Sequence, residues 1–211
     1  MADKTNSIPF VITCADEGVQ INEGIRLGFA GAGFELEGFT EAVTVLKKIL
    51  KADLYLAASS ECAWIKQELN LDEWEEVDAM TQQHLQSLAD REKIKYAGFL
   101  PFADPQELNY GVKGHMVRPH GVHLANKICF TFGGGEQTYN LGQFLISADW
   151  VSEADEKLVE KCIKKQVDFF QGLSKSNLKF VCQMKGVLGE EVAKKNQAVL
   201  KKLGYEMEIV D

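Results

Sequence analysis

The first 60 residues alternate between short apolar runs and amphipathic segments, and this alternation constrains the fold more than any other feature. Residues 8–14 and 53–59 are continuous, mostly apolar runs, which is typical of strands buried on both faces. Between them the pattern predicts a helix over 16–31, a short strand over 34–39 and a second helix over 40–51. Strands and helices that alternate at this spacing form right-handed crossovers and therefore a parallel sheet.

The same alternation continues to the end of the chain. The further predicted elements are helices over 60–69, 80–92, 153–172 and 189–203, and strands over 96–102, 128–132, 178–184 and 206–210. Residues 103–121 contain prolines and glycines without periodicity, which favours a long functional loop or lid. With no internal repeat and no linker in the sequence, we predict one domain over residues 1–211. Its expected fold is a three-layer α/β/α sandwich with a mainly parallel sheet, flavodoxin-like or Rossmann-like.

Composition limits the classes of function. The net charge of −8 argues against nonspecific binding of nucleic acid, which requires a basic face. No signal segment leads the chain, and no apolar run reaches the roughly 18 residues that span a bilayer. Five widely spaced cysteines fit reduced thiols better than a disulfide framework. We therefore expect a cytoplasmic protein that binds a small molecule, without nucleic acid or membrane as partner; a homodimer is compatible with this expectation.

Residues 126–140 carry the clearest functional signal, because an apolar run leads directly into three glycines. Gly133, Gly134 and Gly135 leave their backbone N–H groups uncovered by side chains. Ligands of α/β proteins bind beyond the carboxyl ends of the strands, so we expect this loop to contact a ligand, with a plain tight turn as the alternative. Acids occupy the loop after the first strand, which favours contact with a flat ring over a phosphate clamp.

Two serines and a cysteine lie at the next predicted strand end. The hydroxyls of Ser59 and Ser60, with the N–H groups of the following helix, would form a corner that accepts an anion. Ordinary helix capping is the alternative. Cys62 would fall in the first helical turn, where the pKa of a thiol is lowered. A nucleophilic role also requires a nearby base, and the local sequence contains none.

The irregular loop holds the basic cluster of this acidic chain. Lys113, His115, Arg118 and His120 are predicted to contact an anionic group of a substrate, and a solvated loop is the alternative. Together with His123, the histidines could also bind zinc or a similar metal. However, their spacing matches no common ligand pattern and the neighbouring cations repel a metal ion, so no metal site is predicted.

Part of the chain resembles a known family. Ala-Asp-Leu-Tyr-Leu-Ala at 52–57, followed by a later strand that ends in Gly-Gly and Tyr139, resembles the flavodoxin-like NAD(P)H-dependent quinone reductases. Residues 147–157 also resemble the end of that fold. The resemblance implies bound FMN or FAD beside these residues, although the acidic loop at 14–20 departs from the family's Ser/Thr-rich phosphate loop. The predicted cofactor-binding residues are Ser59, Ser60, Gly133, Gly134, Gly135 and Tyr139.

Three functional hypotheses follow. The first is a flavin-dependent oxidoreductase that acts on a small planar or anionic substrate, in which the cofactor supplies the chemistry. The second is a non-redox ligand-binding or regulatory module without a catalytic centre. The third is a metal- or thiol-dependent enzyme that uses the loop between His115 and His123, or Cys62.

Overall fold

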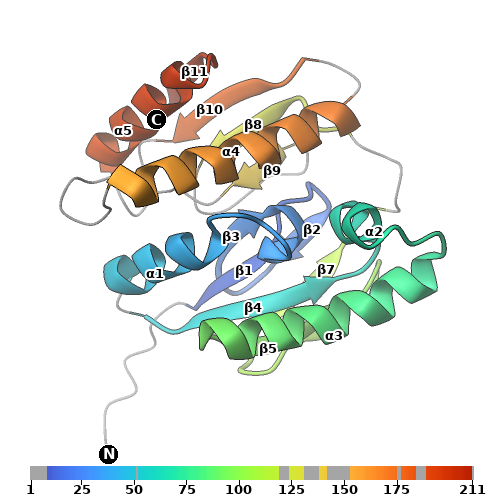
Figure 1. Ribbon diagram of the computed structural model, residues 1–211. Coiled ribbons are helices and arrows are strands. Elements are labelled where there is room, and N and C mark those ends of the chain that lie inside the picture. The colour runs from blue at the N-terminus through green and yellow to red at the C-terminus, as the bar shows by residue number, and fades with distance from the viewer. Residues whose placement is uncertain are drawn as a thin grey trace, which may run out of the picture.

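The structure is a computed structural model that describes residues 9–50, 52–118, 124–130, 138–141, 153–174, 177–183 and 189–210 (Figure 1). Four parallel strands, in the order β3-β1-β4-β5, form the first sheet. They are β1 (Phe10–Cys14), β3 (Ile25–Phe29), β4 (Leu54–Ser59) and β5 (Lys95–Leu100). The chain is thus a mixed α/β protein with a mainly parallel sheet, compatible with the predicted three-layer fold.

Two further sheets are formed by the described residues. The order β11-β10-β8-β9 is again parallel throughout, whereas β2-β7-β6 is antiparallel. The strands of the parallel sheet are β8 (Lys127–Phe130), β9 (Thr138–Leu141), β10 (Lys179–Gln183) and β11 (Met207–Val210). The antiparallel strands are β2 (Val19–Ile21), β6 (Gln106–Glu107) and β7 (Lys113–Met116).

Helices connect and cover the parallel strands. They are α1 (Phe39–Leu50), α2 (Ala63–Leu69), α3 (Trp74–Glu92), α4 (Glu153–Leu173) and α5 (Gly189–Lys202). α3 packs on β4 and β5, α5 packs on β10 and β11, and α1 contacts α4. The helices predicted over 153–172 and 189–203 and the short final strand at the sheet edge are confirmed.

The two parallel sheets repeat one arrangement. The first residue of β1 pairs with the first residues of β3 and β4, as the first residue of β8 pairs with those of β9 and β10. The second residue of β4 pairs with the first of β5, and the second residue of β10 pairs with the first of β11. The edge strands β3 and β9 lie side by side, and β4 and β10 run in opposite directions (Figure 1). The two parallel sheets thus share one strand order and one register, although the sequence shows no repeat.

Two predicted elements near the N-terminus are wrong. The helix expected over 16–31 is instead β2 and β3. Residues 34–38, expected as a strand, form turns closed by hydrogen bonds such as that from Leu36 N–H to the Gly33 oxygen, and α1 follows from Phe39. Ile21, Ile25 and Phe29 share a helical spacing, but three apolar residues do not distinguish a helix from short strands. β3 is stabilised by parallel pairing with β1, and β2 by antiparallel pairing with β7.

The central region is more regular than its sequence indicates. Residues 103–121 were predicted to form a long functional loop or lid, yet β6 and β7 lie within this segment and pair with each other. α3 also begins six residues before the predicted helix at 80, with Glu75 and Glu76 in its first turn. Acidic side chains are favourable there because they oppose the positive end of the helix dipole.

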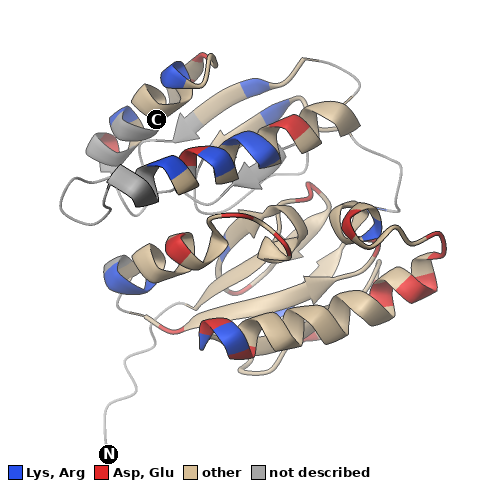
Figure 2. Ribbon diagram, in the orientation of Figure 1, with Lys and Arg blue, Asp and Glu red and all other residues tan. Residues whose placement is uncertain are grey.

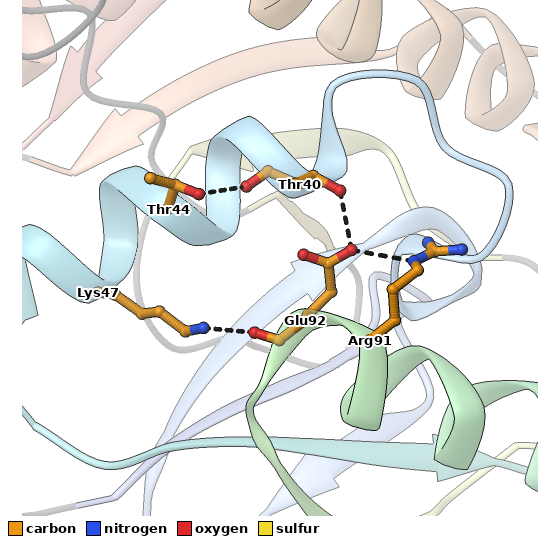
Figure 3. A network of polar contacts seen from close by, with 5 residues as sticks. All are labelled: Thr40, Thr44, Lys47, Arg91 and Glu92. Carbon is orange, nitrogen blue, oxygen red and sulfur yellow. Dashed lines mark hydrogen bonds and ion pairs between the residues drawn. The ribbon is translucent and has the colours of Figure 1, made fainter.

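A polar network holds the end of α3 against α1 (Figure 3). Glu92 is the last residue of α3 and is buried. Its Oε1 accepts hydrogen bonds from Thr40 Oγ1 at 2.8 Å and from Arg91 Nε at 3.2 Å, and its backbone oxygen accepts one from Lys47 Nζ. A buried carboxylate is costly unless such donors satisfy it, so this network fixes one helix relative to the other.

Thr40→Val is expected to lower the free energy of unfolding by about 1–2 kcal/mol, because the buried Glu92 carboxylate loses a donor. Thr44→Val is the matched control, since the exposed hydroxyl of Thr44 donates to the backbone oxygen of Thr40 on its own helix. We expect this control to stay within about 0.5 kcal/mol of wild type in urea denaturation. Equal losses in both variants would contradict a stabilising role for the contact between Thr40 and Glu92.

Candidate functional site

Buried charge marks the carboxyl end of β1. Among the described residues, the charged side chains that are buried are those of Glu17, Arg26 and Glu92. Strands β1 and β4 themselves carry no charged residue (Figure 2). Glu92 belongs to the network between α1 and α3, whereas Glu17 and Arg26 both flank the residues that follow β1. Because burying a charge is costly, these two buried charges indicate a functional site at this end of β1.

A pair of thiols lies at this end of the first sheet. Cys14 is the last residue of β1, and Cys62 directly precedes α2, which follows β4. Because β1 and β4 are adjacent and parallel, their carboxyl ends meet. The Sγ atoms of Cys14 and Cys62 are 3.8 Å apart, and the two residues are only 6% and 4% exposed. Both cysteines are free thiols.

The two thiols differ in acidity. The hydrogen bond from Cys62 lowers the pKa of Cys14, and backbone hydrogen bonds from Asp16 and Gly31 lower it further, against burial and the charge of Asp16. The pKa of Cys62 is raised well above its ordinary value, because its proton is held by Cys14 and because it is buried. The lowered pKa predicted for Cys62 is therefore wrong. Cys14 is thus the more acidic thiol of the pair, and Cys62 donates the hydrogen bond between them.

Arg26 holds the turn that contains Cys14. From β3, its Nε donates to Thr13 Oγ1 at 3.0 Å, and its Nη2 donates to the backbone oxygens of Cys14, at 2.7 Å, and of Asp16. Burial lowers the pKa of Arg26 to about 10, while the negative charges of Cys14 and Asp16 favour its protonated form. Arg26 is thus a cation at neutral pH, and it places positive charge beside Cys14.

The turn after β3 completes the surroundings of Cys14. Gly31 has φ +55°, and a Cβ atom there would lie 2.3 Å from Cδ1 of Trp64. The Trp64 ring is buried, and its Nε1 donates to the backbone oxygen of Phe34 at 2.8 Å. The Gly31 backbone can pack this closely against Trp64 because this residue has no side chain, and the same backbone forms a hydrogen bond to Cys14.

The predicted cofactor residues are only partly described. Ser59 and Ser60 lie at the carboxyl end of β4, as expected, and both are buried. The backbone N–H of Ser60 donates to the backbone oxygen of Leu100, and the Ser60 hydroxyl has no hydrogen-bond partner among the described residues. Gly133, Gly134 and Gly135 lie outside the described residues. Tyr139 lies in β9, but its side chain is not described. Binding of FMN or FAD remains a prediction.

The predicted substrate residues lie on and after β7. Lys113 is exposed, and His115 lies opposite Gln20 in the antiparallel pairing of β7 with β2. Nη1 of Arg118 lies 3.7 Å from Oε1 of the buried Glu17, which also accepts a hydrogen bond from the backbone of Leu124. Arg118 therefore faces a carboxylate of the protein beside the thiol site, and His120 lies outside the described residues. No group of three or more metal-ligating side chains occurs in the described parts of the chain.

Sequence reasoning missed the thiol pair and its supporting residues. The signal that could have found the pair is the position of two cysteines at the ends of neighbouring parallel strands. Arg26 carried no such signal, because its segment was predicted to be a helix.

Comparison with protein-family models, curated proteins and solved structures finds no match to this chain. Within the described residues, no helix has both the length and the apolar character needed to cross a membrane.

Proposed function

We propose that this protein is a two-cysteine redox protein in which Cys14 and Cys62 cycle between a dithiol and a disulfide. The 3.8 Å contact between their sulfur atoms carries this proposal, since a disulfide bond of about 2.05 Å needs less than ~2 Å of further approach. The unequal acidity of the two thiols supports it, because one is the attacking thiolate and the other retains its proton until the second step.

The reaction transfers two electrons to a small oxidant of the disulfide or peroxide class. The Cys14 thiolate attacks one of the two bonded atoms of the oxidant, whose bond breaks and releases the first leaving group as an anion. Cys62 then loses its proton, and its sulfur attacks Sγ of Cys14. The bond between Cys14 Sγ and the second leaving group breaks. This group departs with the electron pair of that bond and takes up the proton. The protein ends as the disulfide, and an external thiol must reduce it again.

The test compares wild type with Cys14→Ser and Cys62→Ser after exposure to oxidised glutathione or hydrogen peroxide. Intact mass and peptide mapping should show one disulfide in wild type, linking Cys14 to Cys62, and none in either variant. Cys162→Ser is the matched control. Burial raises the pKa of this other buried thiol to about 12, so its loss should change nothing. If wild type keeps both thiols, or if the disulfide joins other cysteines, the proposal fails and the non-redox hypothesis gains support.

A further inference from the structure

The burial of the thiol pair restricts the size of its oxidant. Cys14 and Cys62 are 6% and 4% exposed, and one side of Cys14 Sγ is already occupied by Cys62 at 3.8 Å. Attack on a disulfide requires three sulfur atoms in line and room for a substituent on each sulfur of the oxidant. Attack on a peroxide requires room for only two oxygen atoms. A buried thiolate therefore excludes bulky disulfides more strongly than it excludes a peroxide.

The charges around Cys14 also favour reaction with a peroxide. Arg26 is 5% exposed and lies against the backbone of Cys14, so its positive charge acts across a water-poor interior. Asp16 after β1 opposes the thiolate, whereas the backbone hydrogen bonds of Asp16 and Gly31 and the thiol of Cys62 stabilise it. When a peroxide bond breaks, negative charge moves from sulfur to a departing oxygen. A fixed cation and fixed N–H donors stabilise such charge without reorganising.

We propose that the oxidant is hydrogen peroxide or a similarly small hydroperoxide, that Cys14 is the attacking residue and that Cys62 resolves the product. This inference rests on the proposed two-cysteine redox function. It adds the class of oxidant and the order in which the two thiols react.

In the first step, the Cys14 thiolate attacks one oxygen of hydrogen peroxide. A sulfur–oxygen bond forms, the oxygen–oxygen bond breaks, and hydroxide leaves and is protonated to water by solvent. Cys14 is then a sulfenic acid, the first reversible product of thiol oxidation. In the second step, Cys62 loses its proton and attacks Cys14 Sγ, and the departing hydroxide takes up that proton. Two thiols and one peroxide thus give one disulfide and two waters, and an external dithiol reductant restores the protein.

Arg26 acts in this scheme as a positioning residue. It fixes the turn from Cys14 to Asp16 and supplies the nearby positive charge, and no step requires it to exchange a proton. The remaining acidic group beside the turn, Glu17, faces Arg118.

The test measures the rate of oxidation of the full chain by hydrogen peroxide and by oxidised glutathione at equal concentration. Peroxide should form the disulfide at least about 100-fold faster, because only the small oxidant reaches the buried thiolate. The peroxide rate should rise with pH and reach half its plateau below pH 9.0, because the pKa of Cys14 lies below this ordinary thiol value. A dimedone probe should trap a sulfenic acid on Cys14 in Cys62→Ser, and none on Cys62 in Cys14→Ser.

Each outcome separates the two proposals. If glutathione disulfide and peroxide react equally fast, the redox function stands and the inference about the oxidant is overturned. If neither reagent forms the disulfide, both fail. Pulsed peroxide oxidation of wild type, followed by peptide mapping, gives the order of attack even where a serine variant does not fold. A sulfenic acid that appears first on Cys62 would contradict the assigned roles.

Discussion

Arg26→Met is expected to lower the free energy of unfolding by about 2–4 kcal/mol and to raise the pKa of Cys14. The substitution removes donors to three oxygen atoms, those of the Thr13 side chain and the Cys14 and Asp16 backbones. Hydrogen bonds from a charged donor contribute about 1.5–3 kcal/mol each, and relief from burying the cation offsets part of that loss. Urea denaturation measures the stability, and the pH dependence of iodoacetamide labelling measures the acidity of Cys14.

The sign of the acidity change follows from charge. A cation beside Cys14 favours the thiolate, so its loss disfavours the thiolate and moves the labelling midpoint to higher pH. Each unit of increase in pKa slows labelling below the midpoint about tenfold. Arg26→Lys is the matched control, because it keeps the charge but lacks the planar guanidinium group that donates to several oxygens. We expect it to lose stability with a smaller change of midpoint. An unchanged midpoint in Arg26→Met would contradict the electrostatic role.

The parts of the fold that the sequence predicts well are those whose local pattern agrees with their surroundings. The strand predicted over 53–59 is mostly apolar, and its residues 54–59 form the fully buried β4. α4 carries a long amphipathic pattern, and its predicted range of 153–172 differs from the observed helix by one residue. In contrast, β2 is three residues long and depends on pairing with β7, far along the chain. The residues around β2 in the sequence do not include that partner strand, so the prediction of a helix there was wrong.

The register that the two parallel sheets share shows a second limit of prediction from sequence. β1 reads Phe-Val-Ile-Thr-Cys, whereas β8 reads Lys-Ile-Cys-Phe, so the two equivalent strands share a position and little of their sequence. Register is set by backbone hydrogen bonds and by which face is buried, and several apolar residues satisfy both requirements. Two sheets can therefore keep one arrangement while their residues differ.

The strand ends that the sequence singles out meet at one edge of the first sheet, but the thiol pair that lies there was not predicted. The strand ends at Cys14 and Ser59 were expected to supply functional residues because parallel strands place their carboxyl ends together. Cys62 was considered alone, as a thiol in need of a base. Its observed partner is a second thiol from the neighbouring strand, which no motif spacing indicates. A backbone hydrogen bond from Gly31 lowers the pKa of Cys14, and Arg26 donates to the Cys14 backbone oxygen. Both residues are placed there by the pairing of β1 with β3.

Gly31→Ala is expected to destabilise the protein by about 2–4 kcal/mol and to slow the reaction of Cys14. Two costs add at this residue. The backbone has φ +55°, where a side chain is strained by about 1 kcal/mol, and the added Cβ would lie 2.3 Å from the buried Trp64 ring. Overpacking of this kind costs about 1–3 kcal/mol when neighbours must move. Because the Gly31 backbone also bonds to Cys14, relief of the collision should weaken that bond and raise the pKa of Cys14.

Gly111→Ala separates the two costs. Gly111 also has a positive φ, +78°, but no atom of the described residues lies within 4 Å of the position of its Cβ. This control should lose about 1 kcal/mol through backbone strain and leave Cys14 unchanged. Urea denaturation and iodoacetamide labelling at several pH values measure both quantities in the two variants. If Gly31→Ala loses no more stability than Gly111→Ala, Trp64 moves aside without cost. In that case, tight packing against Trp64 does not hold the Gly31 backbone in its hydrogen bond to Cys14.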